Sequence, residues 1–298
     1  MIITNRHNLP PVLVEALRND DYSAGDSDVT VTQLLDAPRI FALKKKHKNE
    51  LQQDVADMVW ALCGQAMHKV LERANGQVGG LFEHRFYRTV LGWKLSGQID
   101  HYCNTTSTLT DYKLTSAWTF KAHAAGEKKH WHTQLNVLSW LMDGYGLDVK
   151  KAQIVAILRD WSKMEAQRAL QWANDNNQPC TYPQSQIQIL EIPLVTKDKT
   201  EAWVEKRITL FQAACENLPL CSDEDRWQKP DVFAVIKKGS TRALKLHPTK
   251  EAAETHASSS DALTVVHRRG EPTRCLLYCP ASAVCSQFQQ KKEKRNGV

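Results

Sequence analysis

The chain contains no run of about eighteen consecutive apolar residues, the length that a membrane-spanning helix needs. Its first residues, MIITNRHNLPPVLVEAL, lack the order of charged, apolar and small residues that marks a secretory signal. The sequence also lacks a phosphate-binding loop of the helicase type, an internal repeat and a low-complexity tract. The first two absences predict a cytoplasmic protein with no membrane partner. Without the phosphate-binding loop the chain is not expected to act as a helicase, so any unwinding would need another protein.

The composition is that of an ordinary globular protein, with 298 residues of which 42% are hydrophobic and 24% are charged. A chain of this length forms one large domain or one domain with an appendage. The formal charge of +6 fits a polyanionic partner but does not require one. Eight cysteines in a reducing compartment favour metal ligands or structural thiols over a disulfide framework.

The stretch GQIDHYCNTTSTLTDYK, from Gly97 to Lys113, carries the most chemistry. Extended patterns over Trp93–Tyr102 and from Leu109 onward flank a run of turn-forming residues, which predicts a hairpin. Pairing of its strands would bring Asp100 near Asp111, and the alternation of side chains puts Asp111 and Lys113 on one face. Two carboxylates beside an ammonium suit a divalent cation and a bound water or phosphate. The alternative is a solvated strand edge.

Helical patterns flank this hairpin on both sides. Upstream, apolar residues recur at helical spacing from Leu51 to Ala74, and His68 and Glu72 lie four apart on one face. Downstream, the pattern HWHTQLNVLSW carries Gln134. A histidine such as His68, taken alone, is by default a hydrogen-bonded core residue.

Together these residues form four ordered blocks: Gly-x-x-x-His-x-x-x-Glu, Gly-x-Ile-Asp, Asp-x-Lys and Gln. In this order they resemble the RecB-like branch of the PD-(D/E)XK nucleases, over roughly residues 31–195. The resemblance implies an α/β fold with a restriction-endonuclease-like core, in which helices flank a central mixed sheet of about five strands. It also implies roles for individual residues: His68, Asp100 and Asp111 as ligands of Mg²⁺ or Mn²⁺, Lys113 as the catalytic lysine, and Gln134 as an organiser of the substrate or the active site.

Two positions differ from many relatives. Leu138 stands where relatives often have tyrosine, and Asp111 stands where many have glutamate. The resemblance implies a metal-dependent deoxyribonuclease, with exonuclease action expected, in recombination, repair or phage DNA processing in a bacterial or phage-infected cell. Its partners would be DNA and a recombinase, helicase or single-strand-binding protein. The alternatives are a non-catalytic nucleic-acid-binding module and an accessory component of a recombination complex; the intact Asp100, Asp111 and Lys113 favour the enzyme.

The rest of the chain predicts three regions: an N-terminal arm (1–30), the nuclease core (31–217) and a C-terminal appendage (218–298). In the core we expect a strand over LFEHRFYRTV, whose Glu83 either assists the metal or, as we prefer, is an exposed strand residue. Further strands are expected over 152–158 and 187–195, and a helix over 200–216. Residues 115–129 are expected to form a flexible substrate loop, and residues 167–184 a loop or hairpin tip.

In the appendage, the segments FAVIKKG, TRALKL and LTVVHRR predict strands and EAAETHA predicts a helix. Cys275, Cys279 and Cys285 have the close spacing of ligands for zinc or an iron–sulfur cluster, and Cys221 is the preferred fourth ligand over Cys215 and Cys63. Relatives often have one such cysteine before the histidine helix, where this chain, around Ala37 and Pro38, has none. On resemblance a 4Fe-4S cluster is preferred to Zn²⁺; the remaining alternative is core packing of small hydrophobic residues, as we expect for Cys103 and Cys180.

Overall fold

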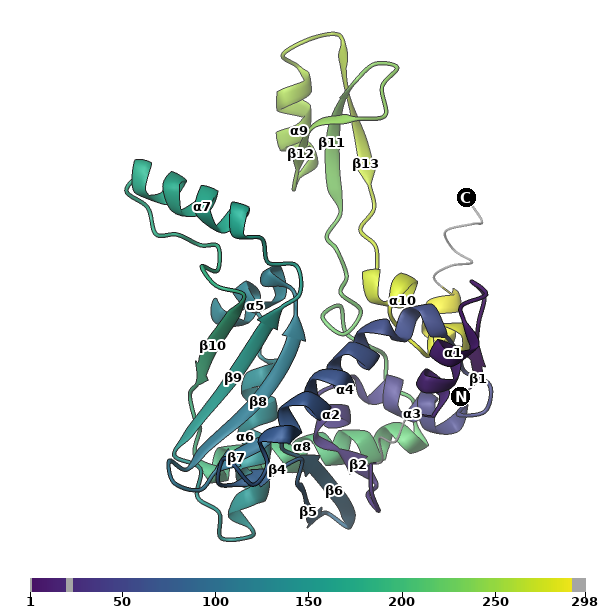
Figure 1. Cartoon of the computed structure of the whole chain (residues 1–298). Helices are drawn as coiled ribbons and strands as arrows, with labels where there is room; N and C mark the ends of the chain where they lie inside the picture. The colour runs from purple at the N-terminus through teal and green to yellow at the C-terminus, as the bar shows by residue number, and fades with distance from the viewer. Residues whose placement is uncertain (1, 20–23, 291–298) are drawn as a thin grey trace. The chain divides into compact units, whose positions relative to one another are not determined.

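The computed structural model describes residues 2–19 and 24–290, which form two compact units (Figure 1). The first comprises the chain up to Asp36 together with Gln52–Glu216, and the second comprises Ala37–Leu51 and the chain from Asn217 onward. This division differs from the three predicted regions, because the N-terminal segment belongs to the first unit and Ala37–Leu51 belongs with the C-terminal residues.

The buried side chain of Arg39 explains why Ala37–Leu51 joins the second unit. Its guanidinium donates hydrogen bonds to the carbonyl oxygen of Pro219 at 2.9 Å and to Oγ of Ser286 at 2.9 Å. Leu43 from the same segment packs against Ala281 and Cys285. A buried guanidinium is stable only when its donors are satisfied, so these contacts bind the early segment to the late one.

The main sheet of the first unit has five strands in the order β10-β9-β8-β7-β4. Its strands are β4 (Leu81–Phe82), β7 (His101–Cys103), β8 (Thr108–Thr115), β9 (Lys151–Leu158) and β10 (Ile187–Ile192). Strands β8 and β9 pair in parallel, and the other neighbours are antiparallel. The predicted mixed sheet of about five strands is therefore confirmed.

A smaller sheet in the same unit has the order β2-β6-β5, formed by β2 (Val29–Thr30), β6 (Trp93–Gln98) and β5 (Arg85–Val90). The predicted continuous strand over Trp93–Tyr102 is wrong, because the chain leaves this sheet after Gln98 and enters the main sheet at His101 as β7. Asp100 lies at this transition. Bending the chain here frees the Asp100 side chain from the regular alternation of a strand.

The other elements of the first unit are mainly helices. They are α1 (Pro11–Arg18), α2 (Val31–Leu34), α4 (Val59–Leu71), α5 (Ala117–Ala124), α6 (His130–Asp143), α7 (Lys163–Asp175) and α8 (Lys197–Glu216), together with the paired strands β1 (Ile2–Thr4) and β3 (Gln52–Asp54). Helices α4, α5 and α6 pack against β8 or β9, so helices flank the sheet as predicted.

The core of this unit lies largely between α6 and the sheets. Its largest fully buried side chains come mostly from these elements: Trp140, Phe86, Phe211, Leu34, Leu95, Ile99, Leu109, Leu135, Leu138, Leu141, Met142 and Ile154. Gly97 permits the close approach of α6 to β6, because a Cβ atom there would lie 2.5 Å from the side chain of Leu138. Close packing of the helix carrying Gln134 therefore requires glycine at this position.

The long helix predicted over 51–74 is wrong in its first part. Residues 52–54 form β3, Val55–Met58 form a 3₁₀ turn, and α4 begins at Val59. Asp54 begins the 3₁₀ turn, since its carboxylate accepts hydrogen bonds from the backbone N–H of Ala56 and from Oγ1 of Thr4 on β1. The side chain caps the turn and joins β3 to the N-terminal strand.

Both predicted loops contain helices instead. Residues 115–129 include α5, which Ser116 caps by accepting a hydrogen bond from the N–H of Thr119. Much of 167–184 belongs to α7, which Ser162 caps through the N–H of Glu165. The sequence of α7 shows little helical periodicity of apolar residues, because only Ala166 and Ala173 in this helix are buried.

The second unit contains a three-stranded antiparallel sheet in the order β12-β11-β13. Its elements are α3 (Pro38–Lys46), β11 (Val232–Lys237), β12 (Ala243–His247), α9 (Lys250–Ala257), β13 (Leu263–Arg268) and α10 (Thr273–Leu277). The strands and the helix predicted for the appendage are confirmed. In the part of the chain that the structure describes, no helix has both the length and the apolar character needed to cross a bilayer.

A buried histidine on α5 gives the fold a pH dependence. The ring of His123 stacks on Trp131 with centroids 3.7 Å apart, and its side chain is buried with Nδ1 lacking a hydrogen-bond partner among the described residues. Burial, and secondarily the charge of Lys128, lower the pKa of His123 to about 4. In the unfolded chain the pKa returns to about 6.5.

We expect His123 to make the protein less stable in acid. The unfolded chain binds this proton more tightly than the folded one, so the stabilisation is complete above pH 6.5 and is lost as the pH falls toward 4. The loss is about 3 kcal/mol, from about 1.4 kcal/mol per pKa unit. Circular dichroism melts should show a smaller drop in melting temperature between pH 7.5 and pH 4.5 for His123→Phe than for wild type. His7→Gln, at an exposed position, is the control; an equal drop in His123→Phe would contradict the prediction.

Candidate active site

Strand β8 positions the aspartate and the lysine of the Asp-x-Lys block. His101 of β7 pairs with Thr110, so the residues just before β7 lie beside Asp111. Nζ of Lys113 donates a hydrogen bond to Oδ1 of Asp111 at 2.9 Å, which shows that these two side chains share a face as predicted. The side chain of Asp111 is only 3% exposed, so this ion pair is shielded from solvent on the carboxylate side.

Asp100 is held against the same strand by the main chain. Its Oδ2 accepts a hydrogen bond from the backbone N–H of Tyr112 at 2.6 Å. Burial, with the negative charge of Asp111 as the next cause, raises the pKa of Asp100 to about 7. Burial alone would lower the pKa of Lys113, but the charges of Asp111 and Asp100 outweigh it and raise that pKa above its usual value. The site therefore holds two carboxylates that repel each other and one firmly protonated ammonium.

Gln134 of α6 acts on Asp111. Its Nε2 donates a hydrogen bond to Oδ1 of Asp111 at 3.1 Å, so Oδ1 accepts from both Gln134 and Lys113. The second oxygen, Oδ2, is buried and lies 2.8 Å from the ammonium of Lys113, yet within the described residues it accepts no hydrogen bond of good geometry. Gln134 thus organises the carboxylate and leaves one oxygen of Asp111 available to a ligand.

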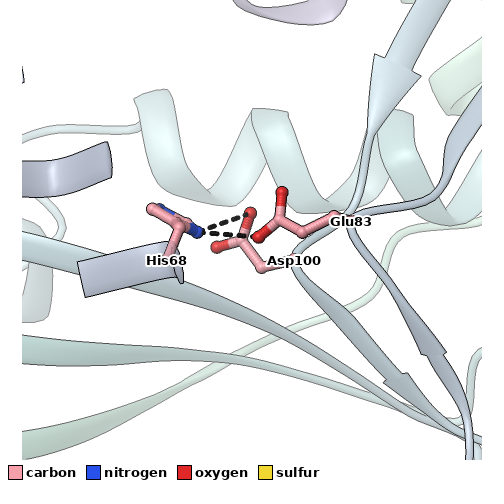
Figure 2. A group of neighbouring side chains, drawn as sticks. All are labelled: His68, Glu83 and Asp100. Atoms are coloured by element: carbon pink, nitrogen blue, oxygen red, sulfur yellow. Dashed lines mark hydrogen bonds and ion pairs between the residues drawn. The ribbon is translucent and has the colours of Figure 1, made fainter. Parts of the chain in front are cut away.

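His68, Glu83 and Asp100 form a second group next to this pair (Figure 2). Nδ1 of His68 lies 3.0 Å from Oε1 of Glu83 and 3.8 Å from Oδ1 of Asp100. The hydrogen bond to Glu83, with the charge of Asp100 in support, raises the pKa of His68 above its usual value against the effect of burial. One ligand atom from each of the three residues lies within 4.8 Å of the other two.

The position of Glu83 differs from the preferred prediction of an exposed strand residue. It lies between β4 and β5 with a backbone φ of 46°, and its side chain is 25% exposed and points toward His68 (Figure 2). The predicted strand over residues 81–90 is interrupted there, because the N–H of Glu83 donates to the carbonyl oxygen of Asp100. In the sequence, Gly79 and Gly80 just before β4 could have indicated that the strand is irregular here.

The residues present fit a divalent cation of the Mg²⁺ or Mn²⁺ type. Asp111 and the group of imidazole and carboxylate ligands line one cavity of about 550 Å³, together with Lys113 and Gln134. Oδ2 of Asp111 is buried and accepts no hydrogen bond of good geometry within the described residues. Oxygen ligands suit both ions, and imidazole suits Mn²⁺. Glu72, which was predicted on the face of His68, also lines this cavity, and its carboxylate pairs with Lys69 at 3.0 Å.

The four cysteines predicted to share a centre lie in the second unit and line one smaller cavity: Cys221, Cys275, Cys279 and Cys285. Burial raises the pKa of Cys221 to about 12 and is also the chief cause of a raised pKa at Cys279. Nε of Arg39 donates to Sγ of Cys285 at 3.3 Å. The four side chains share a cavity, but among the described residues their sulfur atoms do not form a group in which all lie within 4.8 Å of one another, as the ligand atoms of His68, Glu83 and Asp100 do.

Comparisons with known proteins add little to this geometry. No family model matches the chain, and no curated protein matches it in sequence. Among solved structures, the chain is similar to the protein SSO0001, with 19% identity and a TM-score of 0.45 over 67% of this chain and 84% of that one. It is also similar to a phage-related exonuclease from Haemophilus somnus 129PT, with 14% identity and a TM-score of 0.36 over 61% of this chain and 80% of that one. Likenesses of this degree do not establish an activity.

Proposed function

We propose that this chain is a divalent-metal-dependent deoxyribonuclease with a PD-(D/E)XK core. One observation carries the proposal: Asp111, whose buried Oδ2 accepts no hydrogen bond of good geometry within the described residues, lines the same cavity as Asp100, His68 and Lys113. Carboxylates and imidazole hold a cation, and an ammonium beside them can bind a phosphate or a water, which is the set that hydrolysis of a phosphodiester requires.

The cation, when bound, supplies a positive charge that polarises the scissile phosphate and stabilises the charge on the leaving oxygen. His68, Asp100 and Asp111 would hold it. Gln134 and Lys113 fix Oδ1 of Asp111 by hydrogen bonds, which would hold this carboxylate in place for the cation. The Lys113 ammonium also orients the attacking water, which reacts in line with the leaving oxygen, so no covalent enzyme intermediate is needed. Burial raises the pKa of Asp100 to about 7, so a cation held by this carboxyl near neutral pH would displace a proton from it.

Labelled DNA tests this function directly. The purified full chain is incubated with single-stranded and double-stranded DNA in Mg²⁺, in Mn²⁺ and in EDTA, and the products are separated by length. Cleavage in metal and none in EDTA supports the proposal, and the product ladder separates exonuclease from endonuclease action. DNA binding without cleavage under any metal condition would instead support a non-catalytic binding module.

His68 should make manganese an effective ion. Imidazole is a better ligand for Mn²⁺ than for Mg²⁺, so cleavage should be at least as fast in Mn²⁺ as in Mg²⁺. His68→Ala should reduce the rate in Mn²⁺ by more than the rate in Mg²⁺. The measurement is the initial rate at saturating metal for both proteins. Cleavage that occurs only in Mg²⁺ and is unchanged by His68→Ala would remove His68 from the site.

The proposal includes a structural metal centre on Cys221, Cys275, Cys279 and Cys285, with a 4Fe-4S cluster preferred to Zn²⁺. Support comes from the shared cavity that these four side chains line and from Arg39, whose guanidinium donates a hydrogen bond to Sγ of Cys285. The four cysteines belong to the second unit, and the proposed nuclease residues belong to the first. The role of the centre is thus in folding rather than in chemistry.

A further inference from the structure

Glu83 has a backbone conformation that few residues adopt without a reason. Its φ of 46° lies in the left-handed region, where a residue with a side chain such as glutamate is strained. The hydrogen bond from its N–H to the carbonyl oxygen of Asp100 fixes this conformation. The backbone therefore joins Glu83 to Asp100, and the carboxylate is directed at His68 (Figure 2).

A chain of side chains holds the Glu83 carboxylate from behind. Oε2 of Glu83 accepts a hydrogen bond from Nε2 of Gln98 at 2.8 Å. Oε1 of Gln98 in turn accepts from Nη2 of Arg85 at 2.6 Å, on the neighbouring strand where Arg85 and Gln98 are paired. Because the guanidinium can only donate, it sets the orientation of the Gln98 amide, whose NH₂ group must then face Glu83. The carboxylate is held at one oxygen and presents the other to the cavity.

At the centre of the cavity, carboxylates outnumber the cationic side chains among them. Two further cations on the lining, Lys69 and Arg85, contact Glu72 and Gln98. Three carboxylates, those of Glu83, Asp100 and Asp111, lie near the ammonium of Lys113 and the imidazole of His68. Even with His68 protonated and all three acids ionised, one negative charge has no partner in this group. One oxygen of Asp111 also has no well-aligned hydrogen bond within the described part of the chain. Carboxylates gathered at this density in a partly buried site are stabilised by a divalent cation.

We propose that Glu83 is a direct ligand of the divalent cation, held for that role by Gln98 and Arg85. The inference rests on the proposed function for the identity of the site, and it adds a ligand that the four sequence blocks do not include. In this structure, Glu83 and Nδ1 of His68 are hydrogen-bonded to each other. With the ion bound, both groups would contact the ion instead. Gln98 and Arg85 are positioning residues, since they act through Glu83.

Binding of Mn²⁺ to the full chain without DNA tests this assignment. Isothermal titration calorimetry and the electron paramagnetic resonance signal of free Mn²⁺ give the dissociation constant for wild type and Glu83→Gln. The substitution keeps the size of the side chain and removes its charge. We expect the dissociation constant to rise at least about tenfold, the lower end of the loss seen when a group that only supports a ligand is removed. Glu205→Gln, on the exposed side of α8, is the matched control and should leave it unchanged.

A double-mutant cycle separates a ligand from a residue that only orients His68. If Glu83 binds the ion, Glu83→Gln should weaken Mn²⁺ binding in the His68→Ala background as well. If it only orients the imidazole, the substitution should have no further effect there, and the proposal is wrong. Gln98→Ala should weaken binding less than Glu83→Gln does, because the carboxylate remains.

Two further measurements distinguish loss of the metal ligand from misfolding and from failure of the proposed nuclease function. Glu83→Gly removes the carboxylate and suits the left-handed backbone, so it provides a folded variant if Glu83→Gln melts early; it should also lose Mn²⁺ affinity. Wild-type affinity in both variants, or no Mn²⁺ binding by the wild type at millimolar concentration, overturns the inference. If Mn²⁺ binds through Glu83 but DNA is never cleaved, the proposed nuclease function fails while the metal ligand stands.

Discussion

Replacing Asp100 with asparagine should abolish DNA cleavage while leaving the protein folded. The carbonyl oxygen of the new side chain can still accept the hydrogen bond from the N–H of Tyr112, so the local backbone is kept. The negative charge that would hold the cation is lost. We expect the rate at saturating metal to fall by at least about a hundredfold, the upper end of the loss seen when groups that only support a ligand are removed. Product formation from labelled DNA, measured with excess protein, gives the rate.

The stability of this variant should move in the opposite direction from its activity. The pKa of Asp100 is raised to about 7, so the folded protein binds this proton more tightly than the unfolded chain does. The wild type without metal therefore loses stability as the pH rises from about 4 through 7. The asparagine side chain carries no charge, and the melting temperature of Asp100→Asn without metal should exceed that of wild type above pH 7. A gain in stability with a loss of activity is typical of residues under functional constraint.

Lys113→Met tests the other half of the same site. The side chain keeps most of its apolar length and loses the ammonium that contacts Asp111. Cleavage should fall by roughly 10²- to 10³-fold, as for loss of one electrostatic donor to the reacting group, while DNA binding persists. Asp175→Asn, at an exposed position near the end of α7, is the control for a neutralised charge. Wild-type cleavage by either Asp100→Asn or Lys113→Met would refute the proposed site.

The sequence was sufficient to predict the contacts that follow from local pairing. A turn-rich run between two extended segments predicted that Asp100 would lie beside Asp111, and the period of two predicted that Asp111 and Lys113 would share a face. Both relations depend only on neighbours along a hairpin, and the pairing of β7 with β8 produces them. The spacing of the helix likewise predicted that His68 would lie on α4.

The position of Glu83 in the site could not be predicted in this way, because it depends on an interruption of the strand that the sequence predicts over residues 81–90. A regular strand over residues 81–90 would not direct Glu83 into the site, and only the left-handed turn at Glu83 and the break before β7 redirect it. Such a turn is stabilised by a contact with Asp100, which is distant along the chain, so local pattern does not encode it. The helix α7 was missed for a related reason, since a helix with few buried residues has little apolar period.

The cysteine centre should have a large effect on the second unit, and Cys279→Ser tests it. Structural metal sites contribute on the order of 10 kcal/mol in small zinc modules, and a short C-terminal segment has little other core. Around this cavity the described apolar packing is a small cluster of Leu43, Ala281 and Cys285, with Cys279 against it. Loss of one ligand should therefore release the metal, lower the melting temperature and expose the C-terminal residues to protease.

A matched variant, Cys215→Ser, separates metal loss from a general effect of serine. It changes an exposed cysteine of the first unit and should retain metal and stability. Anaerobic purification followed by visible absorption spectroscopy and elemental analysis distinguishes iron from zinc. Because Asp100, Asp111 and Lys113 belong to the first unit, the fraction of Cys279→Ser that remains folded should cleave DNA at the wild-type rate. If the wild type carries neither metal, the four cysteines are core residues, and Cys279→Ser should cost only the small free energy of one buried thiol.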